Sequence, residues 1–249
     1  MSDEIRSSIP PRPIVPGWVE TPTGKLILSA MKFVQHEGVI AAIYGGAGVG
    51  KSMALRRYAD TTPNVWLVTA SPSGAALLAA LEDIAGALGL KDLPSRPRDV
   101  SRAITERLSG VGGLLVIDEA QHLTLQSLEE IRSIHDATQT GLLLCGNEAV
   151  YSRLTGGSRK ATFAQLFSRI GYRHRLGLPT GEDVAAILSA WNVTGAKERE
   201  CALQIAQLPG GLRGLTHALK SAQIVAARSG RPVDDKLLRM AFRDLGGEQ

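Results

Sequence analysis

A glycine-rich octapeptide has the residue types and the spacing of a phosphate-binding loop. It runs from Gly45 to Ser52 (GGAGVGKS) and fits the P-loop pattern G-x-x-x-x-G-K-[ST]. Glycines let backbone N–H groups curl around phosphate oxygens, and the helix that follows presents its positive N-terminal end to them. Lys51 supplies a point charge to the β- and γ-phosphates, and the Ser52 hydroxyl is a ligand for Mg²⁺. The pattern predicts that ATP and Mg²⁺ bind here, with the nucleotide held by Gly45, Gly46, Ala47, Gly48, Val49, Gly50, Lys51, Ser52 and Met53.

Two adjacent acids, Asp118 and Glu119, follow an apolar run (LLVI). Such a run indicates a buried strand, and ligands of open α/β sheets bind at the carboxyl ends of the strands. We expect Asp118 to hold Mg²⁺ and Glu119 to polarise the attacking water. The alternative is an acidic helix start that favours the helix dipole. The P-loop upstream favours the catalytic interpretation.

Two further polar residues are candidates for sensing the nucleotide. Asn147 follows the apolar run at 141–146, and its amide could contact the γ-phosphate or orient the water. Asn is also a common turn residue, which is the alternative. Arg213 lies in Gly-Leu-Arg at the start of a C-terminal helix. It could fold onto the phosphates as a helical lid closes.

The elements that position these residues alternate between apolar strands and helices, which is typical of a parallel sheet covered on both faces. We therefore expect an α/β fold. The predicted strands are 39–44, 64–70, 113–118, 141–146 and 173–178, and the predicted helices are 23–37, one after Lys51, 74–88, 98–109 and 124–138.

The strand signal ends near Pro179, and Thr180–Asp183 resembles a capping box that opens a helix. Three more helices are predicted at 196–207, 212–229 and 232–245. The N-terminal residues contain five prolines up to Pro22, so we expect an extended arm that lies on the domain or reaches a neighbour. The predicted domains are an arm at 1–22, an ATPase core at 23–178 and a helical lid at 179–249.

Composition narrows the class of protein. A hydrophobic content of 44% and a charged content of 21% are ordinary for a globular domain. The N-terminus does not look like a signal peptide, and no apolar run reaches the ~20 residues of a membrane span. Cysteine is sparse, with Cys145 in an apolar run that favours core packing. We expect a cytoplasmic protein that does not bind membranes.

Positive charge is the remaining signal. The net charge is +4, which suits contact with a polyanion. Residues 151–178 carry no Asp or Glu. This stretch indicates phosphate contacts, a subunit interface facing a neighbour's nucleotide, or a solvated basic face. Its basic residues are Arg153, Arg159, Lys160, Arg169, Arg173 and Arg175.

These motifs together resemble AAA+ ATPases that assist transposition, chiefly the Mu B family and more distantly the TnsC and TniB proteins. The resemblance covers about residues 23–225 and rests on the P-loop, VIDEAQH at 116–122, Gly146-Asn147, QLFSR at 165–169 and Gly-Leu-Arg at 211–213. It implies a three-layer AAA+ core with a five-stranded parallel sheet and a small helical lid. The family also has an N-terminal helix-turn-helix domain, where this sequence has the proline-rich arm.

The resemblance implies an ATP-dependent protein that binds duplex DNA without sequence specificity and assembles into filaments on it. It would deliver target DNA to a transposase, which stimulates hydrolysis. By matching position, Asn147 is sensor 1, Arg169 an arginine finger acting on a neighbour's ATP, and Arg213 sensor 2. The matching DNA-contact regions contain Ser71, Ser73, Arg96, Arg98 and Arg102, with Arg159 and Lys160 as the alternative.

Resemblance to a second family leaves an alternative function open. The DEAQH signature also occurs in secretion or signalling ATPases of the ExeA type, whose partner is protein and not DNA. Those relatives usually carry a membrane span or a peptidoglycan-binding module, and neither is expected in this sequence.

Overall fold

A computed structural model describes residues 16–150 and 170–247 of the 249-residue chain. These residues form two compact units, one of residues 23–177 and one of residues 16–22 with 178–247. Four basic residues of the sequence analysis lie outside the described residues, namely Arg153, Arg159, Lys160 and Arg169.

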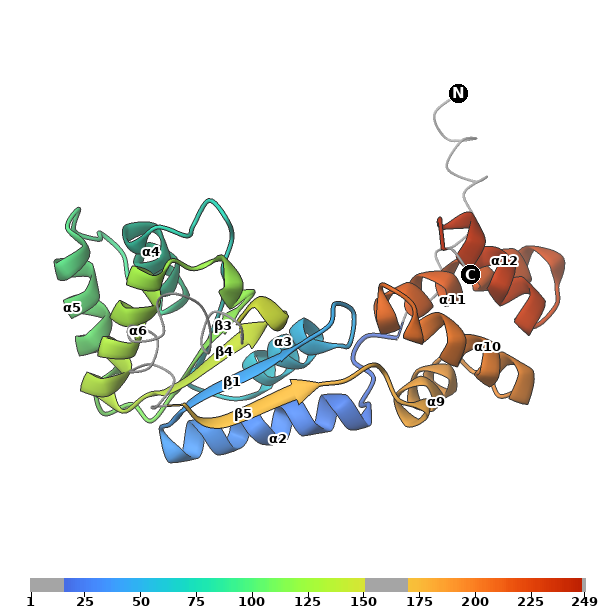
Figure 1. The fold of residues 1–249 in the computed structure, drawn as a ribbon, viewed down its shortest axis with the longest axis horizontal. Coiled ribbons are helices and arrows are strands. Elements are labelled where there is room, and N and C mark those ends of the chain that lie inside the picture. Colours follow the sequence, from blue (N-terminus) through green and yellow to red (C-terminus); the bar gives the residue numbers. More distant parts are fainter. Residues whose placement is uncertain (1–15, 151–169, 248–249) are drawn as a thin grey trace, which may run out of the picture. The chain divides into compact units, whose positions relative to one another are not determined.

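The first unit is built on one parallel sheet, as expected (Figure 1). Its strand order is β2-β3-β4-β1-β5, so β4 lies between β1 and β3. The strands are β1 (Ile40–Gly45), β2 (Val65–Thr69), β3 (Leu114–Asp118), β4 (Gly141–Gly146) and β5 (Ile170–Leu176).

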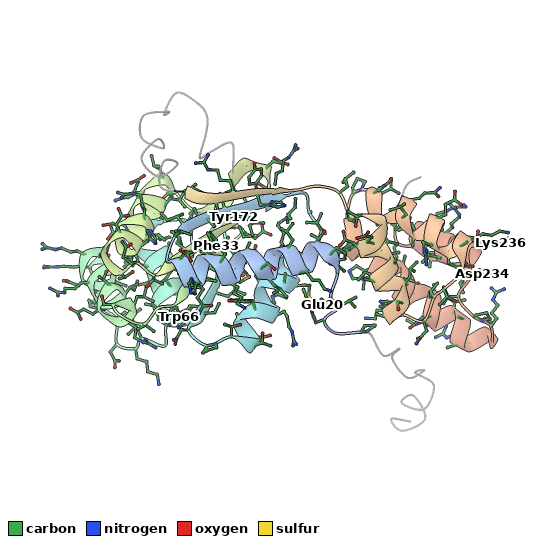
Figure 2. The ribbon with its side chains drawn as sticks, turned by 90° about the horizontal axis from the view of Figure 1, so that it is seen from below. Glu20, Phe33, Trp66, Tyr172, Asp234 and Lys236 are labelled. Atoms are coloured by element: carbon green, nitrogen blue, oxygen red, sulfur yellow. The ribbon has the colours of Figure 1, made fainter. Side chains whose placement is uncertain are left out.

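The predicted bounds of β5 were wrong, because the strand begins at Ile170 and ends at Leu176 instead of spanning 173–178. β5 is an edge strand in which exposed and half-buried residues alternate between its buried ends. An apolar-run criterion therefore misses its start. Its Tyr172 ring lies against Phe33 of the neighbouring helix, with the ring centroids 6.1 Å apart (Figure 2).

Helices cover both faces of the sheet, which gives the expected three layers (Figure 1). Leu81, Ile104 and Ile131 of three helices pack on the face that carries Ala42 and Leu144. The alternate strand residues point to the other face, where the remaining two helices lie. The first group is α4 (Leu77–Ala87), α5 (Pro97–Leu108) and α6 (Leu125–Thr138), and the second is α2 (Pro22–Glu37) and α3 (Lys51–Thr61).

Two helix starts differ from the prediction for local reasons. α4 begins at Leu77 and not at 74, because the N–H of Gly74 bonds back to Ser71 and Ala76 is extended. α2 includes Pro22, which was expected in the arm. Proline is tolerated in a first helical turn, where its missing N–H has no intrahelical partner to lose.

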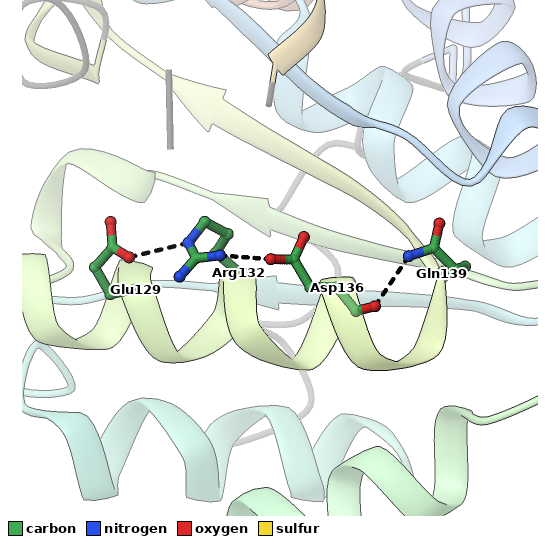
Figure 3. A network of polar contacts seen from close by, with 4 residues as sticks. All are labelled: Glu129, Arg132, Asp136 and Gln139. Carbon is green, nitrogen blue, oxygen red and sulfur yellow. Dashed lines mark hydrogen bonds and ion pairs between the residues drawn. The ribbon is translucent and has the colours of Figure 1, made fainter. Parts of the chain in front are cut away.

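A chain of polar contacts runs along α6 (Figure 3). Arg132 lies between Glu129 and Asp136, and its Nε donates to Glu129 Oε2 at 2.9 Å. Gln139 ends the helix with a φ of 54° and donates to the Asp136 carbonyl at 2.9 Å. At the other end Thr124 caps the helix by accepting from the Ser127 N–H at 3.1 Å. α6 is thus capped at both ends.

The second unit is helical. Its first helix opens with the expected capping box, in which Thr180 and Asp183 bond to each other's backbone N–H. Asp234 caps the last helix, which therefore begins at 235 and not at 232. Val19 of the N-terminal segment packs on this unit's core. The helices are α9 (Gly181–Ala190), α10 (Ala196–Gln207), α11 (Gly211–Ser229) and α12 (Asp235–Asp244).

Within residues 16–150 and 170–247, no helix is both long enough and apolar enough to cross a membrane.

Candidate nucleotide-binding site

The glycine-rich loop connects the end of β1 to the first turn of α3, as the P-loop pattern requires. Two of its glycines are needed for different reasons. Gly50 has a φ of 98°, a conformation that side-chain-bearing residues rarely adopt. Gly45 is limited by space, because a Cβ there would stand 2.6 Å from the Leu176 carbonyl oxygen at the end of β5.

Lys51 is the first residue of α3 and is only 8% exposed. Its Nζ donates to the carbonyl oxygens of Gly45 at 2.9 Å and Gly46 at 2.7 Å. The ammonium group therefore bonds to the loop's own carbonyl acceptors. Phosphate oxygens are stronger, charged acceptors for the same donor, so the arrangement is suited to exchange with a bound triphosphate.

Ser52 and Asp118 meet across two elements, the start of α3 and the end of β3. The Ser52 hydroxyl donates to Asp118 Oδ2 at 2.6 Å, and Asp118 is only 3% exposed. The other carboxylate oxygen accepts the Glu119 N–H at 3.0 Å. A hydroxyl and a carboxylate are the hard oxygen ligands that Mg²⁺ prefers, so the donor set fits this ion.

Glu119 sits in the turn after β3 with a φ of 54°. Gln121 follows in a short 3₁₀ turn, η1 (Ala120–His122), and its Nε2 donates to Glu119 Oε2. The same carboxamide accepts from the backbone N–H of Asn147 through Oε1 at 3.3 Å. Sequence reasoning assigned Gln121 no role, although it lies within the VIDEAQH motif. Its position two residues after Glu119 is the one sequence signal that points to it, and its burial is seen in the structure alone.

Asn147 lies where it was expected, directly after β4, and it is exposed. Its Oδ1 accepts the Ala149 N–H at 2.8 Å, so the turn function of the residue is present. Contact with a γ-phosphate stays a prediction, and it falls to the side-chain NH₂ group because the oxygen serves the turn.

Cys145 lies in β4 and is fully buried, as expected of core packing. Burial raises the pKa of the Cys145 thiol far above its ordinary range, and the Asp118 carboxylate adds to the rise. The thiol is therefore neutral and unreactive in the folded protein.

The residues predicted to touch DNA lie on two segments. Ser71 and Ser73 hydrogen-bond to each other at 3.0 Å in the loop after β2, and Ser71 also accepts the Gly74 N–H. Arg102 pairs with Asp99 at 3.1 Å. The predicted arginines Arg96, Arg98 and Arg102 are all exposed.

The loop after β2 is tied to the segment that carries the acids. Ala70 donates its N–H to the Asp118 carbonyl at 2.9 Å. The Ala75 carbonyl accepts from the Thr124 N–H at 3.2 Å and from the buried Ser127 hydroxyl at 2.9 Å. Hydrogen bonds therefore connect the loop after β2 to both ends of the segment that contains Glu119.

Two predicted site residues are not among the described residues of the first unit, which carries the phosphate loop. Arg213 is exposed in the first turn of α11, in the helical unit, and its contact with phosphate stays a prediction. Arg169 lies outside the described residues.

Comparison with protein families gives two matches, one after the other along the chain. Residues 34–154 match an AAA domain, and residues 168–245 match the C-terminal part of the Mu B transposition protein.

Individual relatives match over most of the chain. The chain is 46% identical over 233 residues to the ATP-dependent target DNA activator B of Escherichia phage Mu, covering 94% of this chain and 75% of that protein. The protein of the same name from Escherichia phage D108 gives the same values. The Mu-like prophage FluMu DNA transposition protein B of Haemophilus influenzae is 38% identical, covering 86% and 74%.

Solved structures share the fold at low identity. Domain III of the Thermotoga maritima replication initiation protein DnaA aligns with a TM-score of 0.58 at 18% identity, covering 95% of this chain and 98% of that one. A Walker-type ATPase of Pyrococcus abyssi aligns with a TM-score of 0.63 at 14% identity, covering 92% and 72%.

Proposed function

The chain belongs to the family of Mu B transposition proteins, ATP-dependent target DNA activators, and from this membership we propose that it loads ATP in order to bind and deliver target DNA. Its core is an AAA ATPase, so the chain binds and hydrolyses a nucleotide. The observation that carries the proposal is the pairing of Ser52 with Asp118 beside the buried Lys51, at the carboxyl ends of parallel strands.

Each residue of the site has a distinct proposed task. Lys51 exchanges the carbonyls of Gly45 and Gly46 for β- and γ-phosphate oxygens, and the glycine backbone supplies further donors. Ser52 and Asp118 would hold Mg²⁺, which when bound neutralises charge on the phosphates. Glu119 orients and polarises the attacking water. Asn147 and Arg213 report the state of the γ-phosphate.

Non-specific contact with duplex DNA is proposed for the loop after β2 and the start of α5. The exposed Arg96, Arg98 and Arg102 can neutralise phosphates without reading bases, which fits binding that ignores sequence. The bonds of Ala70 and Ala75 connect this loop to the segment holding Asp118 and Glu119. DNA contact and nucleotide state are expected to influence each other by this route.

Assembly on DNA into an oligomer or filament, and contact with a transposase, complete the proposal. Arg169 is the proposed finger that one subunit supplies to its neighbour's ATP. Hydrolysis would then depend on assembly, because an isolated subunit lacks that charge at its own phosphates.

The test is a gel shift on random-sequence duplex DNA with ATP, ADP or no nucleotide. We expect a stable complex with DNA only when ATP is present. This complex should be lost in Lys51→Ala, because Lys51 is the cation of the loop. Binding that is equal in all three nucleotide states would contradict the proposal. The ExeA-type secretion or signalling ATPase, which would ignore DNA, gains no support from the comparisons.

A further inference from the structure

We propose that Gln121 is the positioning residue of the ATPase site: it fixes the Glu119 carboxylate and ties it to the end of β4 at Asn147. This inference rests on the proposed role of Glu119 in hydrolysis. Gln121 joins two groups that both have to respond to the γ-phosphate, through one side chain that is 9% exposed.

The two partners of Gln121 determine how its carboxamide is oriented. The backbone N–H of Asn147 can only donate, so it must face the amide oxygen. The ionised Glu119 carboxylate can only accept, so it must face the NH₂ group. Both contacts are satisfied by one orientation, and a flip of the amide would lose both.

The end of β4 leaves room for this bridge. A Cβ on Gly146 would stand 2.1 Å from Gln121 Oε1 and 2.6 Å from a Val150 methyl group. Both distances are shorter than non-bonded heavy atoms tolerate. Gly146 does not have a positive φ, so its backbone does not require glycine. The residue is small because the Gln121 carboxamide occupies the adjoining space.

The consequence for chemistry is that Glu119 is held by one carboxylate oxygen. The other oxygen is then the one that can accept a hydrogen bond from the attacking water. Because the same amide bonds to the Asn147 backbone, a shift of the strand end on binding a γ-phosphate would move the carboxylate with it. Catalytic groups lose about 100-fold in rate when misplaced by ~1 Å, so such a bridge can set the rate.

The deciding variant is Gln121→Met, which keeps the length and burial of the side chain but removes both hydrogen bonds. We expect kcat for ATP hydrolysis to fall about 10- to 100-fold, while KM and the Kd of a fluorescent ATP analogue stay within about twofold. A packing defect would instead alter nucleotide affinity and thermal stability together. Wild-type kcat in a folded Gln121→Met protein would overturn the inference.

A double-mutant cycle shows whether Gln121 acts through Glu119. In a Glu119→Gln background, measured by single-turnover hydrolysis, Gln121→Met should change the residual rate by less than about twofold. A further full loss would mean that Gln121 acts on something else. If Glu119→Gln itself turns over at the wild-type rate, the proposed site fails as well. An inactive Glu119→Gln with a fully active Gln121→Met removes this inference alone.

Two more variants keep the test decisive if Gln121→Met does not fold. Gln121→Glu keeps the acceptor for Asn147 but places an anion where Glu119 needs a donor, so kcat should fall as far. Gly146→Ala should displace the carboxamide from the opposite side and lower kcat with ATP affinity retained. Wild-type kcat in Gln121→Glu would show that donation to Glu119 is not needed and would overturn the inference.

Discussion

Substituting Ser52 by alanine should lower the stability of the nucleotide-free core and abolish its response to Mg²⁺. The hydroxyl donates to Asp118 Oδ2 at 2.6 Å, and Asp118 is only 3% exposed, so water has little access to replace the lost donor. A hydrogen bond to an ionised group contributes about 1.5–3 kcal/mol. At roughly 2–4 °C per kcal/mol for a unit of this size, Tm should fall by about 3–12 °C.

Differential scanning calorimetry of wild type, Ser52→Ala and Ser52→Thr gives the measurement, each without nucleotide, with ATP and EDTA, and with ATP and Mg²⁺. Ligand present at 100 times its Kd stabilises the fold by about 2.7 kcal/mol, so a change in affinity is visible as a change in Tm. We expect the increment from Mg²⁺ to vanish in Ser52→Ala. Ser52→Thr retains the hydroxyl and should keep both the Mg²⁺ increment and most of the stability.

Two results would refute this reasoning separately. An unchanged Tm of nucleotide-free Ser52→Ala would mean that the bond to Asp118 contributes no stability. A wild-type Mg²⁺ increment in Ser52→Ala would mean that the ion is held without this hydroxyl, and the assignment of Ser52 as its ligand would be wrong.

Three further predictions follow from other residues. Burial raises the Cys145 pKa, so above about pH 8.5 the unfolded chain loses a thiol proton that the folded chain keeps. The free energy of unfolding should therefore fall by up to ~1.4 kcal/mol per pH unit above that value. Urea melts at pH 7.5 and 9.5 (~2 units apart around that value) should show a smaller fall in Cys145→Ala than in wild type. Arg169→Ala should lose ~10³–10⁵ in hydrolysis rate with ATP affinity intact, and mixing it with Lys51→Ala should restore part of the ATPase activity; co-assembled mixtures without recovery would exclude a role in trans. Neutralising the exposed Arg96, Arg98 and Arg102 together should weaken DNA binding evenly across sequences. The slope of log K against log salt concentration should become shallower by up to ~3 units. An unchanged slope would point to Arg159 and Lys160 as the DNA contacts.

The sequence predicted the sheet well because four of its five strands are apolar runs, and three of these, β1, β3 and β4, are buried along their whole length. The run at 141–146 became β4 with the same bounds. β5 was misplaced because an edge strand alternates in exposure, with Arg173 and Arg175 pointing outward. Helix starts were wrong by up to three residues where a turn residue such as Gly74 or a cap such as Asp234 decides the boundary.

The pairing of Ser52 with Asp118 was predictable because each residue follows from a motif, and parallel strands bring their carboxyl ends to one edge. The bridge made by Gln121 was not predictable in the same way. It depends on the left-handed backbone of Glu119, which turns the chain so that residue 121 reaches both Glu119 and Asn147. No periodicity in the sequence encodes that turn.

The close contact between Gly45 and the end of β5 ties the phosphate loop sterically to the edge of the sheet. The pairing of β1 with β5 ends with Gly45 beside Leu176, and a Cβ on Gly45 would collide with that residue. The helical unit begins at residue 178, two positions later. The first glycine of the phosphate loop is therefore paired with the last residue of β5, just before the chain enters the helical unit. Any side chain at position 45 would therefore disturb the phosphate loop and the last residue of β5 together.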